Sequence, residues 1–176
     1  MIPKLIISLI IVLVGFLLYA STRANYFRVE RSVRISATPQ KIFSFLNNLR
    51  KGTEWSPWMD IDPNMEINFS GPESGVGATH EWSGNNKIGS GRMTIVESMP
   101  DEKVVLTLDF FKPFKAHNMA EMVLHPNDDG TTTLTWATYG PQSFIGKIMN
   151  LIFNCEKMIG PHFERGLAKL KALAET

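Results

Sequence analysis

The C-terminal segment, residues 145–173, is the most informative part of the chain and has the sequence IGKIMNLIFNCEKMIGPHFERGLAKLKAL. Apolar or small residues recur in it at intervals of three and four: Ile145, Ile148, Ile152, Cys155, Ile159, Phe163, Gly166, Leu170 and Leu173. That spacing places them along one face of an α-helix. Pro161 cannot donate to the carbonyl four residues earlier, so we predict a kink, or a split into two helices, at Gly160-Pro161.

The chain before this segment alternates apolar and polar residues with a period of two, which is typical of half-buried β-strands. Turns rich in glycine, proline and asparagine separate the alternating segments. After the first strand, Thr38-Pro39 is predicted to start a helix that Lys51-Gly52 ends. The seven predicted strands cover residues 27–35, 65–69, 78–84, 92–98, 103–111, 116–125 and 131–139.

These elements predict an α+β fold in which a curved seven-stranded antiparallel sheet wraps on a long C-terminal helix. Strands in hairpin succession pair as neighbours in one antiparallel sheet. One face of that sheet needs a cover, and the C-terminal helix is the only long amphipathic element in the chain. The space between the sheet and the helix is a natural place for a cavity.

The composition restricts the class of protein. The 176 residues are 44% hydrophobic and 20% charged, which fits a folded domain better than a disordered or fibrous chain. The formal net charge of +1 argues against a nucleic-acid partner, because binding to phosphates needs an electropositive face. A single cysteine forms no internal disulfide and no cysteine-rich zinc site. The histidines lack metal-ligand spacing and no phosphate-binding loop occurs, so we expect neither a metal nor a cofactor.

Residues 1–24 form a hydrophobic leader, distinct from the domain expected over residues 25–176. Residues 5–22 contain no charged side chain, and as a helix these eighteen residues span roughly 27 Å, close to the ~30 Å hydrocarbon core of a bilayer. A cleaved signal peptide is the alternative, with Ala20 or Ala24 near the cut. The length of the apolar run favours a retained, single-pass membrane anchor.

The side of the membrane on which the domain lies stays open. Four arginines follow the leader, whereas only Lys4 and the amino terminus precede it: Arg23, Arg28, Arg31 and Arg34. By the positive-inside rule this excess favours a cytoplasmic domain. The same arginines can instead belong to the first strand of the domain. In that case their number says nothing about the orientation of the chain in the membrane.

Several local motifs in the body are distinctive: Trp55-Ser-Pro-Trp58, Ser70-Gly-Pro-Glu-Ser-Gly-Val-Gly-Ala78, Lys157-Met-Ile-Gly160, Phe163-Glu164 and Gly166-Leu167. Together with the order of elements, they resemble the START-like (SRPBCC) superfamily of helix-grip folds, and within it the polyketide cyclase/dehydrase branch with a hydrophobic N-terminal segment. The resemblance covers roughly Tyr26 to Ala174 and implies a hydrophobic ligand held between sheet and helix. The superfamily includes lipid carriers, hormone receptors, aromatase/cyclases and co-chaperone activators. The resemblance therefore does not assign a particular reaction to this chain.

Two polar residues are predicted to face the cavity, because their neighbours on the same strand face are mainly apolar. His80 alternates with Thr79 and Glu81 and shares its face with Trp82. It would orient a ligand oxygen or act as an acid/base, since histidine titrates near neutral pH; the alternative is a packed core histidine. Asn118 is also predicted to point inward, where its amide needs a partner from a ligand or from the neighbouring strand.

Aromatic and methionine residues are predicted to line the same cavity, because such side chains make adaptable walls for an apolar ligand. The alternative is that they form an ordinary core. Trp55 and Trp58 are interpreted either as residues at the cavity mouth or as clamps between the short helices and the sheet. The predicted wall residues are Phe69, Trp82, Phe110, Trp136, Met149, Phe153 and Met158.

Three functions from different classes fit these patterns. The first is a membrane-anchored START-like module that binds a lipid or another hydrophobic small molecule. The second is a polyketide cyclase- or dehydratase-like enzyme, with His80 as the acid/base and Asn118 as an orienting group. The third is a protein-interaction module at the membrane. The neutral body and its apolar interior favour the first function.

Overall fold

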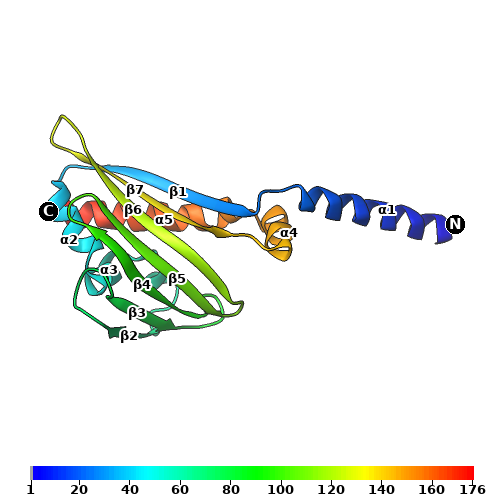
Figure 1. Ribbon diagram of the computed structural model, residues 1–176, viewed down its shortest axis with the longest axis horizontal. Coiled ribbons are helices and arrows are strands. Elements are labelled where there is room, and N and C mark those ends of the chain that lie inside the picture. Colours follow the sequence, from blue (N-terminus) through cyan, green and yellow to red (C-terminus); the bar gives the residue numbers. More distant parts are fainter. Residues whose placement is uncertain (1) are drawn as a thin grey trace.

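The computed structural model describes residues 2–176, with side chains from Lys4 onward. A curved sheet wraps on a C-terminal helix, and a further helix projects from this body at the N-terminus (Figure 1). The helices are α1 (Ile2–Ser21), α2 (Pro39–Leu46), α3 (Leu49–Trp55), the short 3-10 helix η1 (Pro57–Asp60), α4 (Phe144–Phe153) and α5 (Cys155–Ala174). The strands are β1 (Tyr26–Ile35), β2 (Glu66–Ser70), β3 (Thr79–Ser83), β4 (Ser90–Met99), β5 (Lys103–Lys112), β6 (Ala116–Pro126) and β7 (Thr132–Pro141).

The seven strands form one antiparallel sheet of order β1-β7-β6-β5-β4-β3-β2. β1 pairs with β7 along its whole length, so the first strand lies beside the last, and the other strands follow in hairpin succession. An irregularity in β4 between Ile95 and Glu97 shifts its register with β5, which increases the local twist of the sheet. The predicted helix-grip fold is confirmed.

The core lies where α5 packs on the concave face of the sheet. Phe163 of α5 stacks on Trp136 of β7 with ring centroids 4.0 Å apart. Gly166, one turn later, allows the helix to approach closely, since a Cβ there would lie 2.9 Å from Pro57 Cδ and 3.0 Å from Trp136 Cζ3. α5 is therefore held in direct contact with β7 and η1.

The C-terminal helix is split, but at a different residue from the one predicted. α4 and α5 part at Asn154, whose left-handed backbone has φ 52° and ψ 89°. The Asn154 side chain accepts a hydrogen bond from the Lys157 N–H and so caps the start of α5. Pro161 lies inside α5, so the prediction of a split at Gly160-Pro161 is wrong. Pro161 leaves the carbonyl of Lys157 without a partner in the helix, and Lys157 is an exposed residue.

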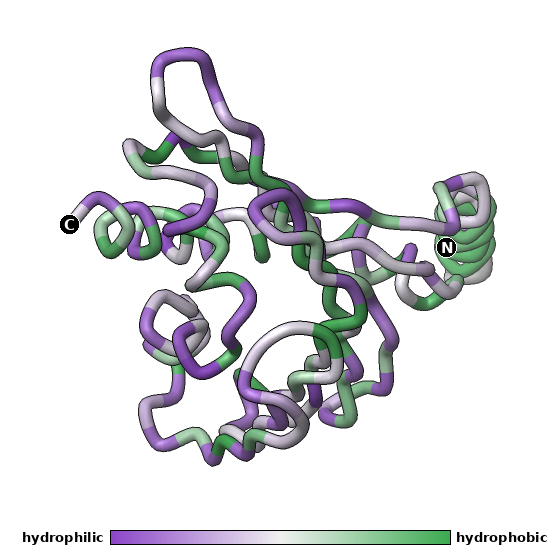
Figure 2. Tube along the Cα trace, turned by 60° about the vertical axis from the view of Figure 1, so that its left-hand side comes forward, coloured by the Kyte–Doolittle hydropathy of each residue, from purple (hydrophilic) through white to green (hydrophobic). Residues whose placement is uncertain are grey.

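α1 extends away from the body (Figure 1) and is mainly apolar along its length (Figure 2). Among the described residues it is the one helix long and apolar enough to cross a membrane, and only 6% of residues 4–21 are buried. Its C-terminal end nevertheless contacts the body. Ala20 is fully buried, and Lys147 Nζ of α4 donates a hydrogen bond to the Ser21 carbonyl at 3.3 Å.

Three of the four arginines that follow the leader belong to β1: Arg28, Arg31 and Arg34. Arg31 lies across the surface of α5 and pairs with Glu156 at 2.5 Å and with Glu164 at 2.7 Å. Gly160, which lies between the two glutamates, leaves room for the guanidinium, because a Cβ there would overlap it. Since at least Arg31 serves the fold, these arginines carry less information on membrane orientation than their number suggests.

Candidate functional site

A cavity of about 350 Å³ lies between the concave face of the sheet, α3, η1 and α5. Its walls are mainly leucine, methionine and aromatic side chains from β3 to β7 and from the helices. Among the described lining residues, Lys87 is the only lysine, arginine, aspartate or glutamate, and it is exposed on the turn between β3 and β4. The interior of this cavity is therefore suited to an apolar molecule.

His80 on β3 is a buried polar side chain in one wall of the cavity, with 6% of its surface exposed. Its ring centroid lies 5.0 Å from that of Phe69 and 6.3 Å from that of Trp82. Burial lowers the pKa of His80 from 6.5 to about 4, because apolar surroundings disfavour the charged imidazolium. His80 is therefore uncharged at neutral pH. Its Nε2 atom has no hydrogen-bond partner within residues 2–176.

Trp55, the last residue of α3, also lines the cavity and is the second lining residue with an unpartnered buried polar atom. Its Nε1 is buried and has no acceptor in the described part of the chain. The indole packs edge-to-face on Trp136 with centroids 5.4 Å apart. The Trp-Ser-Pro-Trp motif predicts either a mouth position or a clamp between the short helices and the sheet. Trp55 contacts the sheet through Trp136, whereas Trp58 stacks on His162 of α5 at 4.7 Å. The polar contact offered by Trp55 is not visible in that motif.

Two glycines make room for large side chains in the wall. Gly140 on β7 lies beside Asn118 on β6, and a Cβ at Gly140 would overlap the Asn118 amide. Gly91 on β4 pairs with Trp82 on β3, and a Cβ at Gly91 would overlap the indole. Close packing against the neighbouring strand therefore fixes the positions of Asn118 and Trp82.

The structure brings most of the predicted contact residues together. Phe69 is beside them rather than in the lining: its ring contacts His80 and lies under the Arg50 guanidinium at 4.4 Å. A role of these side chains in ligand binding stays a prediction. The predicted residues that line the cavity are His80, Trp82, Phe110, Asn118 and Trp136.

Met149, Phe153 and Met158 lie outside the cavity, so the prediction that they line it is wrong. They expose 43%, 53% and 56% of their surface, respectively. Met149 and Phe153 belong to α4, which the break at Asn154 separates from the helix that faces the sheet, and Met158 lies on the outer side of α5. The methionines that do line the cavity are Met59, Met65, Met93 and Met122. The period of two in β4 and β6 is the signal that points to Met93 and Met122.

The described residues contain no group of three or more histidine, cysteine, aspartate or glutamate side chains able to hold a metal ion. Cys155 is half-buried, and burial raises the pKa of its thiol. A thiol with a raised pKa is a poor nucleophile at neutral pH.

Solved structures with the same fold share little sequence with this chain. A protein from Nitrosospira multiformis is 17% identical, with a TM-score of 0.60, over 84% of this chain and 96% of its own. A truncated norcoclaurine synthase from Thalictrum flavum is 11% identical, with a TM-score of 0.62, over 84% of this chain and 92% of its own. A protein from Mesorhizobium loti is 20% identical, with a TM-score of 0.57, over 84% of this chain and 96% of its own. These similarities show the fold alone.

The sequence itself matches one protein family. No curated protein matches the chain. The model of the family described as polyketide cyclase/dehydrase and lipid transport matches residues 26–175, which is nearly the whole body after α1. The chain therefore belongs to the polyketide cyclase/dehydrase and lipid transport family.

Proposed function

We propose that this protein is a membrane-anchored module that binds a lipid or another apolar small molecule in the cavity between the sheet and α5. One observation carries the proposal: a mainly apolar cavity of about 350 Å³ is lined by His80 and Trp55, and each of these residues has a buried polar atom without a partner, Nε2 and Nε1 respectively. Membership of a family described in part as lipid transport supports the same class of ligand.

The two polar atoms indicate which groups the ligand carries. Trp55 Nε1 only donates, so it needs an acceptor oxygen or nitrogen. Neutral His80 donates or accepts at Nε2 according to its tautomer, and a hydroxyl group satisfies either form. A buried polar atom without a partner costs about 1–3 kcal/mol, which a ligand hydrogen bond would recover in part. We therefore infer an apolar molecule with at least one hydroxyl or carbonyl group.

α1 supplies the membrane anchor in this proposal. Its apolar side chains are exposed along nearly the whole helix, which is unfavourable in water and favourable in a bilayer. Its C-terminal end is built into the body, since Ala20 is fully buried and the Ser21 carbonyl accepts a hydrogen bond from Lys147. Cleavage of a signal peptide after Ala20 would remove the buried Ala20, and cleavage after Ala24 would also remove the Ser21 contact, so both contacts support a retained helix.

The acid/base role considered for His80 has less support. Acid/base catalysis is most efficient when the pKa of the group lies near the working pH. With a pKa of about 4, His80 is uncharged at neutral pH and is suited to a neutral hydrogen bond. Ligand binding is therefore the function that we propose for this cavity.

Native mass spectrometry of the full chain, released from a mild detergent, tests the ligand-binding proposal. We expect the wild type to retain a bound apolar molecule and to enhance the fluorescence of Nile red. Ala120→Phe adds a phenyl group to the cavity from β6 and should abolish both signals, because Ala120 is 4% exposed and lines the wall.

Val123→Phe is the matched control, because Val123 lies on the opposite face of the same strand. This variant should keep the bound molecule and the Nile red signal. If a folded Ala120→Phe protein retained both signals at wild-type level, the cavity would not be the binding site.

A further inference from the structure

The polar and apolar faces of α4 are reversed relative to a surface helix of a water-soluble protein. Ile145, Met149 and Ile152 share one face, at positions i, i+4 and i+7, and expose 71%, 43% and 59% of their surface. Lys147 lies on the opposite face, toward the body, and is only 7% exposed. A surface helix in water buries its apolar face and exposes its lysines. The outer face of α4 is therefore suited to a less polar medium.

The polar inner face of α4 has a structural use. Lys147 Nζ donates to the carbonyl of Ser21 at 3.3 Å, at the end of α1, where helical carbonyls have no partner in their own helix. Asn150 Oδ1 accepts a hydrogen bond from the Cys155 N–H at 2.8 Å, at the start of α5. These bonds tie α4 to both neighbouring helices and leave its apolar face turned outward.

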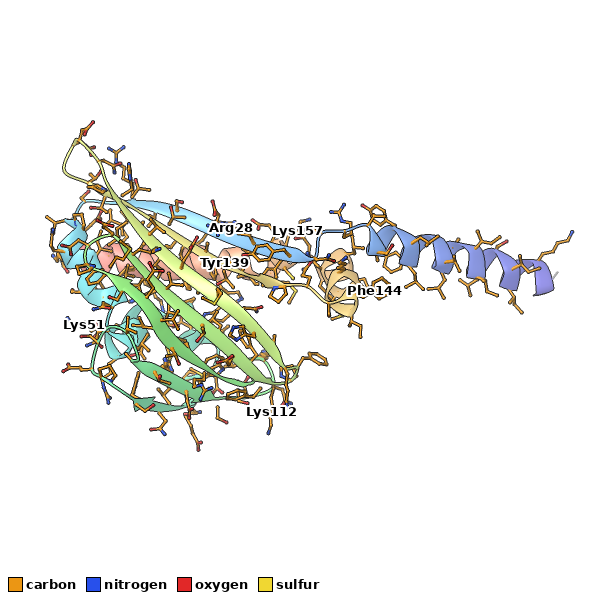
Figure 3. The ribbon with its side chains drawn as sticks, in the orientation of Figure 1. Arg28, Lys51, Lys112, Tyr139, Phe144 and Lys157 are labelled. Carbon is orange, nitrogen blue, oxygen red and sulfur yellow. The ribbon has the colours of Figure 1, made fainter. Side chains whose placement is uncertain are left out.

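α4 lies at the end of the body from which α1 projects, and Phe144 is at this end (Figures 1 and 3). Only residues 22–25 separate α1 from β1. Where α1 crosses a bilayer, its C-terminal end reaches the surface and α4 lies at the level of the head groups. The β5–β6 hairpin, with Lys112 and the 76% exposed Phe114, ends on the same side of the body (Figure 3).

The charges at this end suit an anionic membrane. Residues 110–120 and 138–155 contain no aspartate or glutamate, and the exposed Lys112 and Lys115 lie in the first of these ranges. Arg23 lies just after the end of α1. An exposed apolar helix face with basic side chains nearby is the usual combination for binding at the surface of a bilayer that contains anionic lipids.

We propose that α4 is a second membrane contact, whose outer face inserts among the head groups of the anionic bilayer that α1 spans. The outer face comprises Phe144, Ile145, Met149, Ile152 and Phe153. This inference rests on the anchoring by α1 in the proposed function and is independent of ligand binding. With α1 alone, only the contacts of Ala20 and Ser21 with the body would set its tilt, whereas a second membrane contact would restrain that tilt further and hold the cavity at a constant orientation to the membrane.

Fluorescence quenching in vesicles tests the second contact. Cys155 is the only cysteine, so the full chain with Cys155→Ala accepts single new cysteines for labelling with NBD. In vesicles of phosphatidylcholine and phosphatidylglycerol, we expect the label at Ile152→Cys to shift to the blue and to lose fluorescence when lipids carry a nitroxide near the head group. The label at Val96→Cys is the matched control and should stay in water, because Val96 is an exposed apolar position on β4.

Flotation of the same vesicles separates this inference from the anchoring proposal. If the chain floats and the label at Ile152→Cys stays in water, the α4 contact is overturned and the anchor stands. If the chain does not float, both are overturned, while native mass spectrometry still reports ligand binding. In a second variant, Ile145→Ser with Ile152→Ser, a label at Met149→Cys should lose its quenching although the chain still floats. Quenching that persisted there would show that the apolar face does not make the contact.

Discussion

The helices α4 and α5 are separated by one residue, Asn154, and bury opposite kinds of side chain. α5 places Phe163, Leu167 and Leu170 against the sheet, where each is at most 2% exposed. α4 places Lys147 toward the body and leaves most of its large apolar side chains exposed. Both helices carry an apolar stripe of the same spacing, but that stripe belongs to the core in α5 and to the surface in α4.

This difference shows that an apolar stripe identifies one face of a helix. It does not tell whether that face contacts the protein core or the surroundings of the protein. In α5 the stripe contacts the sheet, because Gly166 permits close approach to Trp136. In α4 the left-handed Asn154 redirects the chain toward the end of α1 (Figure 1). The stripe of α4 then faces outward at the end of the body that we propose lies on the membrane.

The largest expected effect comes from removing one apolar side chain from each helix. Phe163→Ala should lower the free energy of unfolding by about 3–5 kcal/mol, because it opens a hole beside Trp136 in the core. Ile152→Ala should change it by no more than about 0.5 kcal/mol, because this side chain is mostly exposed. Urea unfolding of the full chain in detergent, followed by circular dichroism, measures both values. Equal losses would mean that α4 is packed as tightly as α5.

A smaller effect is expected at the residue that separates the helices. Asn154→Ala should lower the free energy of unfolding by about 2 kcal/mol, because it removes the cap of α5 and forces alanine into a left-handed backbone. Asn154→Gly is the matched control and should lose only a few tenths of a kcal/mol, because glycine adopts this backbone without strain. The same urea unfolding measures both variants. A stable Asn154→Ala protein would show that the two helices can join into one.

The smallest effects are expected from adding one methyl group to a glycine in each helix. Gly166→Ala should lower the free energy of unfolding by about 1 kcal/mol, since overpacking against Pro57 and Trp136 outweighs the better helix propensity of alanine. Gly146→Ala should raise it by about 0.5–1 kcal/mol, because the nearest atom, Ser143 Oγ, would be at an ordinary 3.4 Å. Thermal unfolding in detergent gives the sign of each change. The comparison between the helices fails if both signs are the same.

Much of the cavity wall was predictable from the strands. A strand alternates its side chains between two faces, so a few apolar neighbours indicate where His80, Trp82, Asn118 and Trp136 point. The apolar stripe of residues 145–173 predicted the cavity-facing helix residues less reliably. Its spacing places residues on one face only if they belong to a single continuous helix. The helix is interrupted at Asn154, and the prediction for the α4 residues, including Met149, was therefore wrong.

The unpartnered polar atoms of the site were not predictable. Whether Trp55 Nε1 and His80 Nε2 find a hydrogen-bond partner depends on which side chains reach them from other elements. Pro161 gave a misleading signal for a similar reason. Its missing hydrogen bond is tolerated because Lys157 is exposed, while Arg31 from β1 holds the helix through Glu164 on the far side of the proline.

Composition and short-range periodicity were sufficient for the seven strands, the α+β fold, the apolar leader and the near-neutral body, because each of these is a property of neighbouring residues. The position of the helix break, the residues that line the cavity and the outward apolar face of α4 required the folded molecule. They depend on contacts between segments far apart in the chain, such as Lys147 with Ser21, Arg31 with Glu164 and Gly166 with Pro57. Such contacts leave no periodic pattern in the sequence.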